Sequence, residues 1–543
     1  MNRPSPPSDK ALDKILAETR RLHDAGRLQE AEAGYRDVLA ADPTHVKARS
    51  LLGALLLQKG QPQSALPELE HAHHLRPDQP PILINLAAAY LGIGRARDAA
   101  DACRRVLELA PENHEAHFNL GHALLDLRDW AGAVRAYEEN IRLNPLDGRG
   151  YGALGDALKE KGEFDAAMVA FETAMTLAPD HPGAYLGVAD LLLRRGWPHA
   201  ALVVMDNIAA HLANDVVLQR RTAEMRLSMG QLAEGWDKFD ETRLQSVGAK
   251  PQPEPPPHWR GEDLKGKRLL IWSEQGLGDE VLYAGLVPDV IARGAQCTIA
   301  SSYRMTAVFK RSFPGADVTE RSSVGDVGQF DFQVHAGSLG RFLRRSFTEF
   351  PAHTGYLKCD PREQTVRRRK YEDIARGRRI VGLAWKSVHN VLGSSKSAEL
   401  ANLGAILTVP GVMFVGLQYG DCSHDYAAAR AKFGIEIYQD PDIDQRSDVE
   451  KFFAQVAAMD LVVSTSNSTA HVGGAMNIPT WLLLPRGRGA LWYWFLQRED
   501  SPWYPSVKII RGGLERDEPW EIQASKFAGA ELARWQAQPA VGA

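Results

Sequence analysis

The chain has 543 residues and a mass of 59.9 kDa, with 44% hydrophobic and 24% charged residues. These proportions are ordinary for a soluble protein, and at about 150 residues per domain the length allows several domain-sized units. The formal net charge of −4 favours neither nucleic acid nor a membrane surface as a partner, and no apolar run is long enough to span a bilayer. The N-terminus lacks the apolar segment of a secretory signal, so we expect a cytoplasmic protein. The cysteines are isolated in sequence, which favours reduced thiols over disulfides or a zinc site: Cys103, Cys297, Cys359 and Cys422.

Three columns of residues recur every 34 positions in the first 245 residues. The alanine column is unbroken, and the glycine column is interrupted once, by Arg128. This period predicts helix–turn–helix repeats of the tetratricopeptide (TPR) type, in which glycine ends the first helix and proline follows the second. The columns are Ala31, Ala65, Ala99, Ala133, Ala167 and Ala201; Gly26, Gly60, Gly94, Gly162, Gly196 and Gly230; and Pro43, Pro77, Pro111, Pro145 and Pro179.

The repeats are expected to form one array over residues 12–245, preceded by a disordered tail at 1–11. A seventh, degenerate helix pair should cap the array through Trp236 and Phe239. Such arrays expose a concave groove that suits a protein partner. The six full repeats are 12–45, 46–79, 80–113, 114–147, 148–181 and 182–215.

Asn85 and Asn119 occupy the same position in successive repeats, on the first helix of each pair. A side-chain amide offers a donor and an acceptor together, which matches the backbone of an extended peptide. The repeat half resembles in architecture the O-linked N-acetylglucosamine transferases, whose groove carries an asparagine ladder of this kind. The alternative is that asparagine is simply common at this position.

The histidines of HAHH (71–74) are better explained as a solvated helix face than as a metal site, since no acid or cysteine ligand is near.

Residues 246–263 are proline-rich and are predicted to form a stiff linker. Beyond them, short β-branched runs alternate with helical segments, which predicts parallel βαβ units. We predict two Rossmann-like halves at 264–378 and 379–515, then a C-terminal helix and tail at 516–543. The basic segment 366–379 should be a helix and connector with a solvated face, and the lesser alternative is that it faces an anionic donor across the cleft. The predicted strands are RLLIWS, CTIAS, FDFQVH, IVGLAW, MFVGLQ, IEIY, LVVST and TWLLL.

Two segments follow predicted strands and carry polar chemistry. In WSEQGLGDEVLYAG (272–285), glycines precede Asp279 and Glu280, and glycine is needed where the backbone must bend or be approached closely. The run Ser464 to Thr469 precedes a helix, and hydroxyls with free helix N–H groups make an anion site. Simple helix capping is the alternative in both places. Because ligands bind at the carboxyl ends of parallel strands, both segments are expected to face one site.

Several ordered motifs resemble the C-terminal domain of TPR-bearing glycosyltransferases related to the ADP-heptose–lipopolysaccharide heptosyltransferases. They are EQGLGDEVLYAG, SFPGADV, GLAWK, GLQYGD, SNSTAHVGGAMNIPTW and the ending WYWFLQREDSPWYPSVKIIR (492–511). With the repeats, the resemblance covers nearly the whole chain. It implies an α + α/β protein, a TPR superhelix followed by a GT-B domain. Some members of this group modify flagellin with sialic-acid-like sugars.

The resemblance also implies roles for individual residues. Asp279 would be the general base that takes the proton of the acceptor hydroxyl, and Glu274 would orient it or bind acceptor. Lys386 or Lys396 would neutralise the leaving phosphate in place of a metal ion. Where the heptosyltransferases carry Asp-Thr, this chain has Ser466 and Asn467, a departure that concerns the choice of sugar. The implied donor and phosphate residues are Trp385, Lys386, Lys396, Gln418, Tyr419, Ser466, Asn467, Ser468, Thr469 and His471.

These observations predict a metal-independent, inverting glycosyltransferase with no cofactor. It would move a sugar from a nucleotide sugar to Ser or Thr hydroxyls of a protein, such as flagellin, held by the TPR groove. Two alternatives remain open at this point. One is a scaffold whose transferase-like domain binds ligand without catalysis, and the other is a transferase with a glycan or lipid acceptor.

Overall fold

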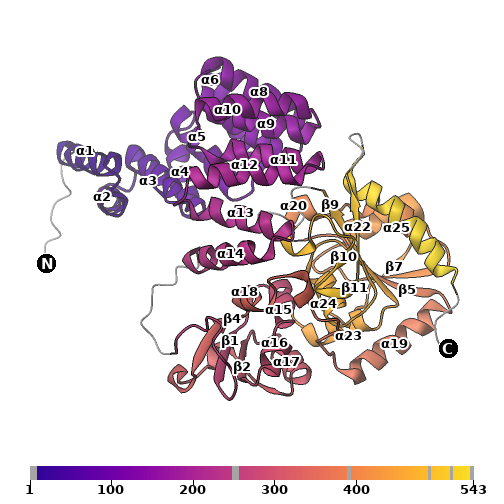
Figure 1. Cartoon of the computed structure of the whole chain (residues 1–543). Helices are drawn as coiled ribbons and strands as arrows, with labels where there is room; N and C mark the ends of the chain where they lie inside the picture. Colours follow the sequence, from indigo (N-terminus) through magenta and orange to yellow (C-terminus); the bar gives the residue numbers. More distant parts are fainter. Residues whose placement is uncertain (1–8, 247–255, 388–392, 487–490, 514–517, 539–543) are drawn as a thin grey trace, which may run out of the picture. The chain divides into compact units, whose positions relative to one another are not determined.

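The computed structural model describes residues 9–246, 256–387, 393–486, 491–513 and 518–538 (Figure 1). The chain forms two compact units, residues 1–191 and 192–543. Residues 1–8 of the predicted tail, 247–255 of the predicted linker, and 516–517 and 539–543 of the predicted C-terminal segment lie outside the described residues. The first helix begins at Asp9, so the last residues of the predicted tail are helical.

Fourteen helices occupy residues 9–246 and form seven helix–turn–helix pairs, one in each predicted repeat and one after them. The helices of the first unit form a TPR-like superhelix, as predicted. The pairs are α1 (Asp9–Asp24) and α2 (Leu28–Ala41), α3 (Val46–Gln58) and α4 (Pro62–Leu75), α5 (Pro80–Gly92) and α6 (Ala96–Leu109), α7 (His114–Asp126) and α8 (Trp130–Leu143), α9 (Gly148–Lys161) and α10 (Phe164–Leu177), α11 (Pro182–Arg194) and α12 (Pro198–His211), and α13 (Val216–Ser228) and α14 (Leu232–Ser246).

The three sequence columns have the structural causes that the repeat predicts. Every alanine of the column is fully buried, which lets the two helices of a pair approach closely. All six glycines of the column have positive φ, the left-handed conformation that glycine adopts without a Cβ clash. Arg128, the exception in the column, adopts the same conformation with φ 61°. The repeat geometry therefore overrides the preference of the residue at this position.

Replacing Arg128 by glycine is expected to raise the free energy of unfolding by about 1 kcal/mol, because a left-handed conformation costs a residue with a Cβ roughly that much. Urea unfolding of the full chain, followed by far-UV circular dichroism, measures the change. The reverse substitution is the matched control. Gly162→Arg, at a position with φ 91° and nothing within 4 Å of an added Cβ, should lower stability by a similar amount. A less stable Arg128→Gly protein would contradict this account.

The second unit contains two sheets that are parallel except at one edge. The first sheet has four strands in the order β3-β2-β1-β4, and the second has seven in the order β10-β11-β9-β8-β5-β6-β7, with β10 antiparallel to β11. The predicted parallel α/β region is confirmed. The strands are β1 (Arg268–Trp272), β2 (Gln296–Ser301), β3 (Ala316–Glu320), β4 (Phe332–His335), β5 (Arg379–Ala384), β6 (Val412–Gly416), β7 (Ile437–Tyr438), β8 (Leu461–Ser464), β9 (Thr480–Pro485), β10 (Asp500–Ser501) and β11 (Tyr504–Gly512).

The helices of the α/β region connect these strands and cover their faces (Figure 1). Helix α15 packs against α24, so the first helix after β1 touches the helix that follows β8 of the other sheet. The helices are α15 (Leu277–Ala284), α16 (Val287–Ala292), α17 (Thr306–Ser312), α18 (Gly340–Leu343), α19 (Pro361–Ala375), α20 (Gly393–Lys396), α21 (Gly404–Leu407), α22 (Ser423–Phe433), α23 (Val449–Ala457), α24 (Ser468–Ala475) and α25 (Trp520–Gln536).

The basic helix α19 differs from its prediction as a solvated face. Arg367 is buried and pairs with Asp440, which also accepts hydrogen bonds from Lys370 Nζ and the Tyr371 hydroxyl, both at 2.7 Å. Arg368 pairs with Asp460 at 2.7 Å. The basic side chains therefore fasten α19 to loops of the seven-stranded sheet region.

The last helix pair, α13 and α14, packs within the second unit and not as a free cap. The buried Trp236 of α14 lies edge-on to Trp492, with ring centroids 5.1 Å apart. An added Cβ on Gly340 would lie 2.3 Å from the Trp236 ring, so only glycine permits this contact. Phe239 joins the same buried cluster. The aromatic residues predicted to cap the repeats thus serve the core of the α/β region.

Candidate active site

Asp279 lies in the first turn of α15, directly after β1. The residue before this helix, Gly276, has no side-chain cap, and Asp279 makes no hydrogen bond or ion pair among the described residues. Glu274 accepts hydrogen bonds from Arg243 Nη1 and the Gly337 amide, both at 2.9 Å, and not from the helix. The capping alternative is therefore wrong for both acids. The Asp279 carboxylate is left available for chemistry.

The environment of Asp279 favours a proton acceptor. The residue is exposed to solvent, yet the protein crowds its carboxyl group closely, and this desolvation raises the pKa to about 6. The negative charge of Glu274 raises the pKa further, while Lys396, Arg220 and Arg243 lower it. A carboxylate with a pKa near 6 is largely ionised at neutral pH but holds a proton more strongly than an ordinary aspartate. These are the properties of a general base.

Glu280, the other acid of the pair, has a structural role. Its buried carboxylate accepts hydrogen bonds from the Ser273 hydroxyl and from the amide and hydroxyl of Ser302, each at 2.8 Å. Ser273 follows β1 and Ser302 follows β2, so Glu280 ties α15 to the ends of two strands. The two adjacent acids therefore face opposite ways, one into the fold and one into solvent.

Gly278 explains why glycine precedes Asp279. A Cβ at this position would lie 3.2 Å from His471 Cδ2 and 3.9 Å from Ser468 Cα, on the first turn of α24. Glycine thus lets the N-terminal ends of α15 and α24 approach each other. Asp279 from the first sheet and the hydroxyl-rich turn from the second sheet are consequently brought together, as the sequence predicts.

Lys396 is the cation of this site. Its residue is only 7% exposed, and its Nζ makes no hydrogen bond or ion pair with any described residue. Burial lowers the pKa of Lys396, and the charge of Asp279 acts in the opposite direction. A buried cation without a partner is costly, so such a group usually awaits an anionic ligand. Asp279, Lys396 and the first turn of α24 form what we call the transfer site.

The hydroxyl-rich turn before α24 has a divided role. Asn467 is the N-cap, accepting from the Thr469 amide at 3.0 Å and from the Ser464 hydroxyl at 2.9 Å. Ser466 accepts a hydrogen bond from Trp494 Nε1 at 2.9 Å and is buried. In contrast, the buried Thr469 hydroxyl has no partner among the residues that the structure describes, and the half-buried Ser468 makes no side-chain hydrogen bond with them. Part of this turn therefore caps α24, and part keeps hydroxyl groups outside the capping network.

His471 is held in the neutral form behind that turn. Burial, and then the charge of Lys396, lower its pKa to about 3. Its Nδ1 lies 2.8 Å from the Tyr504 hydroxyl, and its ring stacks on Trp494 with centroids 5.0 Å apart. Tyr504 also bonds to Tyr356, whose hydroxyl donates to the Val281 carbonyl at 2.8 Å. If Tyr504 donates to Tyr356, Nδ1 carries the histidine proton and Nε2 is an acceptor beside Gly278.

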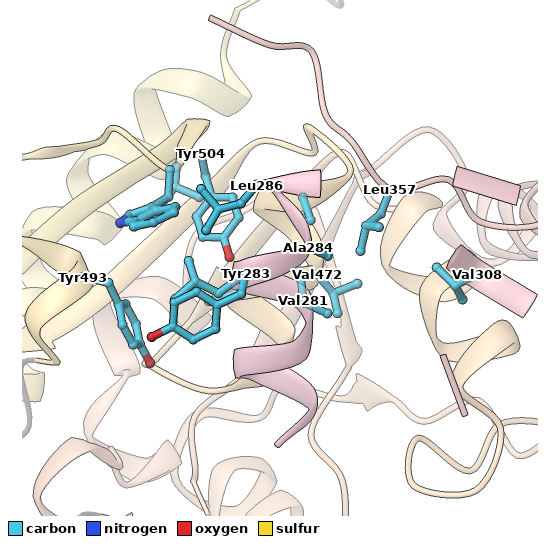
Figure 2. Close-up of a cluster of buried hydrophobic side chains, with 14 of the residues drawn as sticks. Val281, Tyr283, Ala284, Leu286, Val308, Leu357, Val472, Tyr493 and Tyr504 are labelled. Carbon is cyan, nitrogen blue, oxygen red and sulfur yellow. The ribbon is translucent and has the colours of Figure 1, made fainter. Parts of the chain in front are cut away.

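Figure 2 shows the aromatic packing that joins α15 to the seven-stranded sheet region. Tyr283 of α15 and Tyr493 lie side by side, and Tyr504 directs its hydroxyl toward α15. Tyr283 and Tyr493 are buried, and burial followed by the charge of Asp279 raises the pKa of both phenols well above the usual range. Both phenols therefore remain protonated near Asp279. The sequence motifs contained these tyrosines, but no pattern assigned them a role.

The remaining predicted donor residues gather at the ends of β5 and β6. The Gln418 side-chain carbonyl accepts from the amides of Trp385 and Lys386, at 2.9 and 2.7 Å. Lys386 Nζ forms an ion pair with Asp425 at 2.6 Å, and the buried Trp385 packs edge-on to Tyr426. Tyr419 is half-buried beneath the guanidinium of Arg446. Because the Asn467 amide reaches the Lys386 carbonyl at 3.3 Å, this cluster adjoins the transfer site.

Arg243 of α14 is a site residue that the sequence did not reveal. It is buried, bonds to Glu274 through Nη1, and bonds to the Ser338 hydroxyl through Nη2. Ser338 in turn donates to Asp240 of the same helix. The last repeat-like helix therefore holds the loop that precedes Asp279. The repeat pattern assigns α14 to a degenerate repeat, so nothing in the sequence connects Arg243 with the transferase half.

Replacing Arg243 by glutamine is expected to shift the pH dependence of activity to higher pH. The substitution removes a positive charge that lowers the pKa of Asp279 and leaves the charge of Glu274 unpaired, so the carboxyl of Asp279 should need a higher pH to ionise. Rate measurements across pH 5–8, a range around the value of about 6 for Asp279, test this expectation.

The matched control is Asp237→Asn, which breaks ion pairs of the same helix with Arg341 and Arg345 but does not touch Glu274. Its pH profile should coincide with that of the wild type. An unchanged pH profile for Arg243→Gln, or an equal shift in both variants, would show that Arg243 only stabilises the packing of α14 against the loops that contain Glu274 and Ser338.

In the first unit, Asn85 and Asn119 lie on α5 and α7, the first helices of their pairs. Both are half-buried, and neither makes a side-chain hydrogen bond with a described residue. A hollow of about 320 Å³ lies among α6, α7 and α8, lined by residues that include Arg104, His117 and Leu124, but not by either asparagine. The asparagine ladder stays a prediction.

The described residues contain neither a cluster of metal ligands nor a membrane-spanning helix. No group of three or more His, Cys, Asp or Glu side chains there is arranged to hold a metal ion. None of the helices in the described ranges combines the length and the apolarity that crossing a bilayer requires. All four cysteines are free thiols and buried.

Comparison with known proteins supports the repeat assignment. Two family models described as tetratricopeptide repeat match this chain, one at residues 84–148 and 119–182 and the other at 56–101. The N-terminal region consists of tetratricopeptide repeats. This agrees with the 34-residue period, the buried alanine column and the left-handed turns.

One curated relative is Protein FlbA of Caulobacter vibrioides, 32% identical over 334 residues, an alignment that covers 58% of this chain. The alignment spans 54%, about half, of that relative's length.

Solved TPR structures are also similar. One from Parabacteroides merdae is 19% identical, with a TM-score of 0.38 and coverage of 45% of this chain and 95% of its own. A thermophilic TPR protein of Thermus thermophilus is 23% identical, with a TM-score of 0.32 and coverage of 34% and 99%.

Proposed function

We propose that this protein is an inverting glycosyltransferase of GT-B type that moves a sugar from a nucleotide sugar to a hydroxyl group of a protein. One observation carries the proposal. Asp279, a carboxylate with a raised pKa, stands beside the buried Lys396 and the first turn of a helix from the other sheet, and neither side chain is paired with a described residue. Base and anion site are thus assembled from two separately folded sheets.

The reaction would be a single displacement. The acceptor oxygen attacks the anomeric carbon while Asp279 takes the hydroxyl proton, and a new C–O bond forms. The bond between the anomeric carbon and the phosphate oxygen breaks on the opposite side, and its electron pair leaves with the nucleotide. Attack from the side opposite the leaving group inverts the anomeric centre.

The leaving phosphate would be received by the transfer site. Lys396 supplies a positive charge in a site of low dielectric, where one charged contact is worth more than in water. The N–H groups at the start of α24 and the hydroxyls of Ser468 and Thr469 add donors aimed at an anion. The nucleotide would then extend toward Lys386, Gln418 and Tyr419 at the ends of β5 and β6. Neutral His471 orients the turn without adding charge.

The acceptor is proposed to be a protein bound by the TPR unit, because repeat arrays present extended surfaces for protein partners. Flagellin is the first candidate to test, by the resemblance to TPR-bearing transferases. The chain is also similar to Protein FlbA, but the name of that protein states no activity.

Intact-mass analysis of candidate acceptors tests the proposal directly. Acceptor proteins are compared from cells with the wild-type chain, without the chain, and with Asp279→Asn. A sugar-sized mass increase that is present only with the wild type supports protein glycosylation. No mass change in any strain, with normal partner binding, would favour a non-catalytic scaffold. A mass change that appears instead on a surface glycan or lipid would place the acceptor outside the protein class.

A further inference from the structure

Two arginines lie next to each other at the carboxyl ends of β9 and β11. In the parallel register Arg511 pairs with Leu484, and Arg486 follows Pro485, the last residue of β9. Side chains alternate between the faces of a strand, so position 486 shares a face with Leu484 and therefore with Arg511. The Arg486 amide nitrogen also lies 3.8 Å from where a Cβ of Gly513 would be, which confirms that these strand ends remain adjacent.

Both guanidinium groups have buried donors without partners. Nε and Nη1 of Arg511 and Nε of Arg486 are buried and make no hydrogen bond within the described part of the chain. A guanidinium carries five N–H donors, and a buried donor left unpaired is destabilising. Each residue nevertheless keeps part of its surface exposed. The site therefore combines unmet hydrogen-bonding capacity with partial access to solvent.

No carboxylate neutralises this pair among the described residues. Neither arginine forms an ion pair, and the exposed Glu499 influences Arg511 only from a distance. Burial, followed by the charge of Arg486, lowers the pKa of Arg511 to about 10, which reflects two cations held close together in a poorly hydrated place. Two adjacent, half-buried cations without a counter-charge are unfavourable unless an anion joins them.

A purely structural role accounts for only part of Arg511. Its Nη2 donates to the carbonyls of Trp494 at 2.9 Å and Phe495 at 2.5 Å. Phe495 has a positive φ of 46°, so this clamp holds a strained turn. The clamp uses neither Nε nor Nη1 of Arg511, and it does not involve Arg486.

We propose that Arg486 and Arg511 form a second anion-binding site that takes one carboxylate or phosphate group of a ligand. The paired donors of guanidinium groups match two oxygens of either group, and charge-assisted bonds of this kind are strong. The site is connected to the transfer site through one residue. Trp494, whose carbonyl Arg511 holds, stacks on His471 and donates to Ser466. A ligand anion at the arginine pair would therefore lie near the transfer site but contact different residues.

Titration calorimetry of the full chain tests this site with inorganic phosphate and with D-glucuronate, and with neutral D-glucose as the control ligand. The measurements are made in the Lys396→Met background, which removes the cation of the transfer site, so the outcome does not depend on the proposed transferase function. Arg486→Gln is the informative variant because the Arg486 side chain makes no hydrogen bond with a described residue that the substitution would remove. Arg430→Gln removes the same charge from an exposed position in the same half of the region.

We expect one of the anions to bind and Arg486→Gln to weaken it by roughly 10- to 100-fold, the range for one lost charged hydrogen bond. Arg430→Gln should not change the affinity for either anion, and D-glucose should not bind. Weakening confined to phosphate or to glucuronate identifies the ligand class. If neither anion binds, or if Arg486→Gln binds both anions as well as its parent, the proposal fails and Arg511 is only a clamp of the Phe495 turn.

Discussion

Replacing Asp279 by asparagine is expected to lower kcat/KM for sugar transfer by about 10²- to 10⁴-fold, the usual contribution of a general base. Asparagine keeps the shape of the side chain but cannot accept the acceptor proton. Because Asp279 forms no hydrogen bond with a described residue, the variant should fold normally. Its affinity for nucleotide should be equal or higher, since a negative charge near the phosphate site is removed.

The same residue sets the expected pH dependence. Asp279 must be ionised to act as a base, so kcat/KM of the wild type should be constant at high pH and fall as the pH drops below about 6. Nucleotide release from the donor sugar is measured with and without acceptor. The difference between the two rates is the rate of sugar transfer to the acceptor. Asp326→Asn is the control because Asp326 is an exposed acid of the same half that only supports a local turn. A fully active Asp279→Asn enzyme would exclude the proposed base.

Replacing Lys396 by methionine is expected to weaken nucleotide binding and lower kcat by about 10²- to 10³-fold, as for other groups that stabilise developing charge. Methionine keeps the length and the apolar stem but removes the charge. Since Lys396 is buried and pairs with no described residue, the substitution should leave the free energy of unfolding unchanged or higher. Calorimetry against UDP, GDP, ADP and CMP, without added Mg²⁺, measures the binding loss.

Two other lysines make this prediction sharper. Lys386 is already paired with Asp425 and is partly exposed, so Lys386→Met should have a smaller effect than Lys396→Met. Lys432→Met, which removes an exposed lysine that bonds to the Ala401 carbonyl, should have no effect. A larger loss for Lys386 than for Lys396, or binding that requires Mg²⁺ strictly, would contradict the role assigned to Lys396.

Much of the fold was predictable because the same local structural constraints recur in every repeat. The alanine and glycine columns each follow from one constraint, close helix packing or a left-handed turn, and seven helix pairs appear where the period places them. The buried strands were predictable from their apolar runs. The edge strand β3 was missed because ADVTE is half-exposed and carries charge, and β11 was missed because polar residues interrupt YPSVKIIRG.

The candidate site was predictable only where its residues follow strands. Asp279 and the turn before α24 were found because parallel strands place their carboxyl ends together. Arg243 was not found, since it lies on a helix that reads as a repeat and reaches Glu274 only through tertiary packing. The partners of Ser466 and Asn467 were also hidden, because a capping serine and a ligand-binding serine look alike in sequence. Side-chain partners, not residue types, separate these roles.

The most direct test of the account is the pKa of the Asp279 carboxyl group, measured by ¹³C NMR on protein labelled at aspartate Cγ. The Asp279→Asn spectrum assigns the signal, and the titration is repeated with a saturating nucleoside diphosphate. We predict a pKa of about 6 in the free protein and a higher value with nucleotide, because the phosphates add negative charge and neutralise Lys396. A pKa near 4 that does not change with nucleotide would contradict the account, because Asp279 would then face neither a desolvated pocket nor a leaving group.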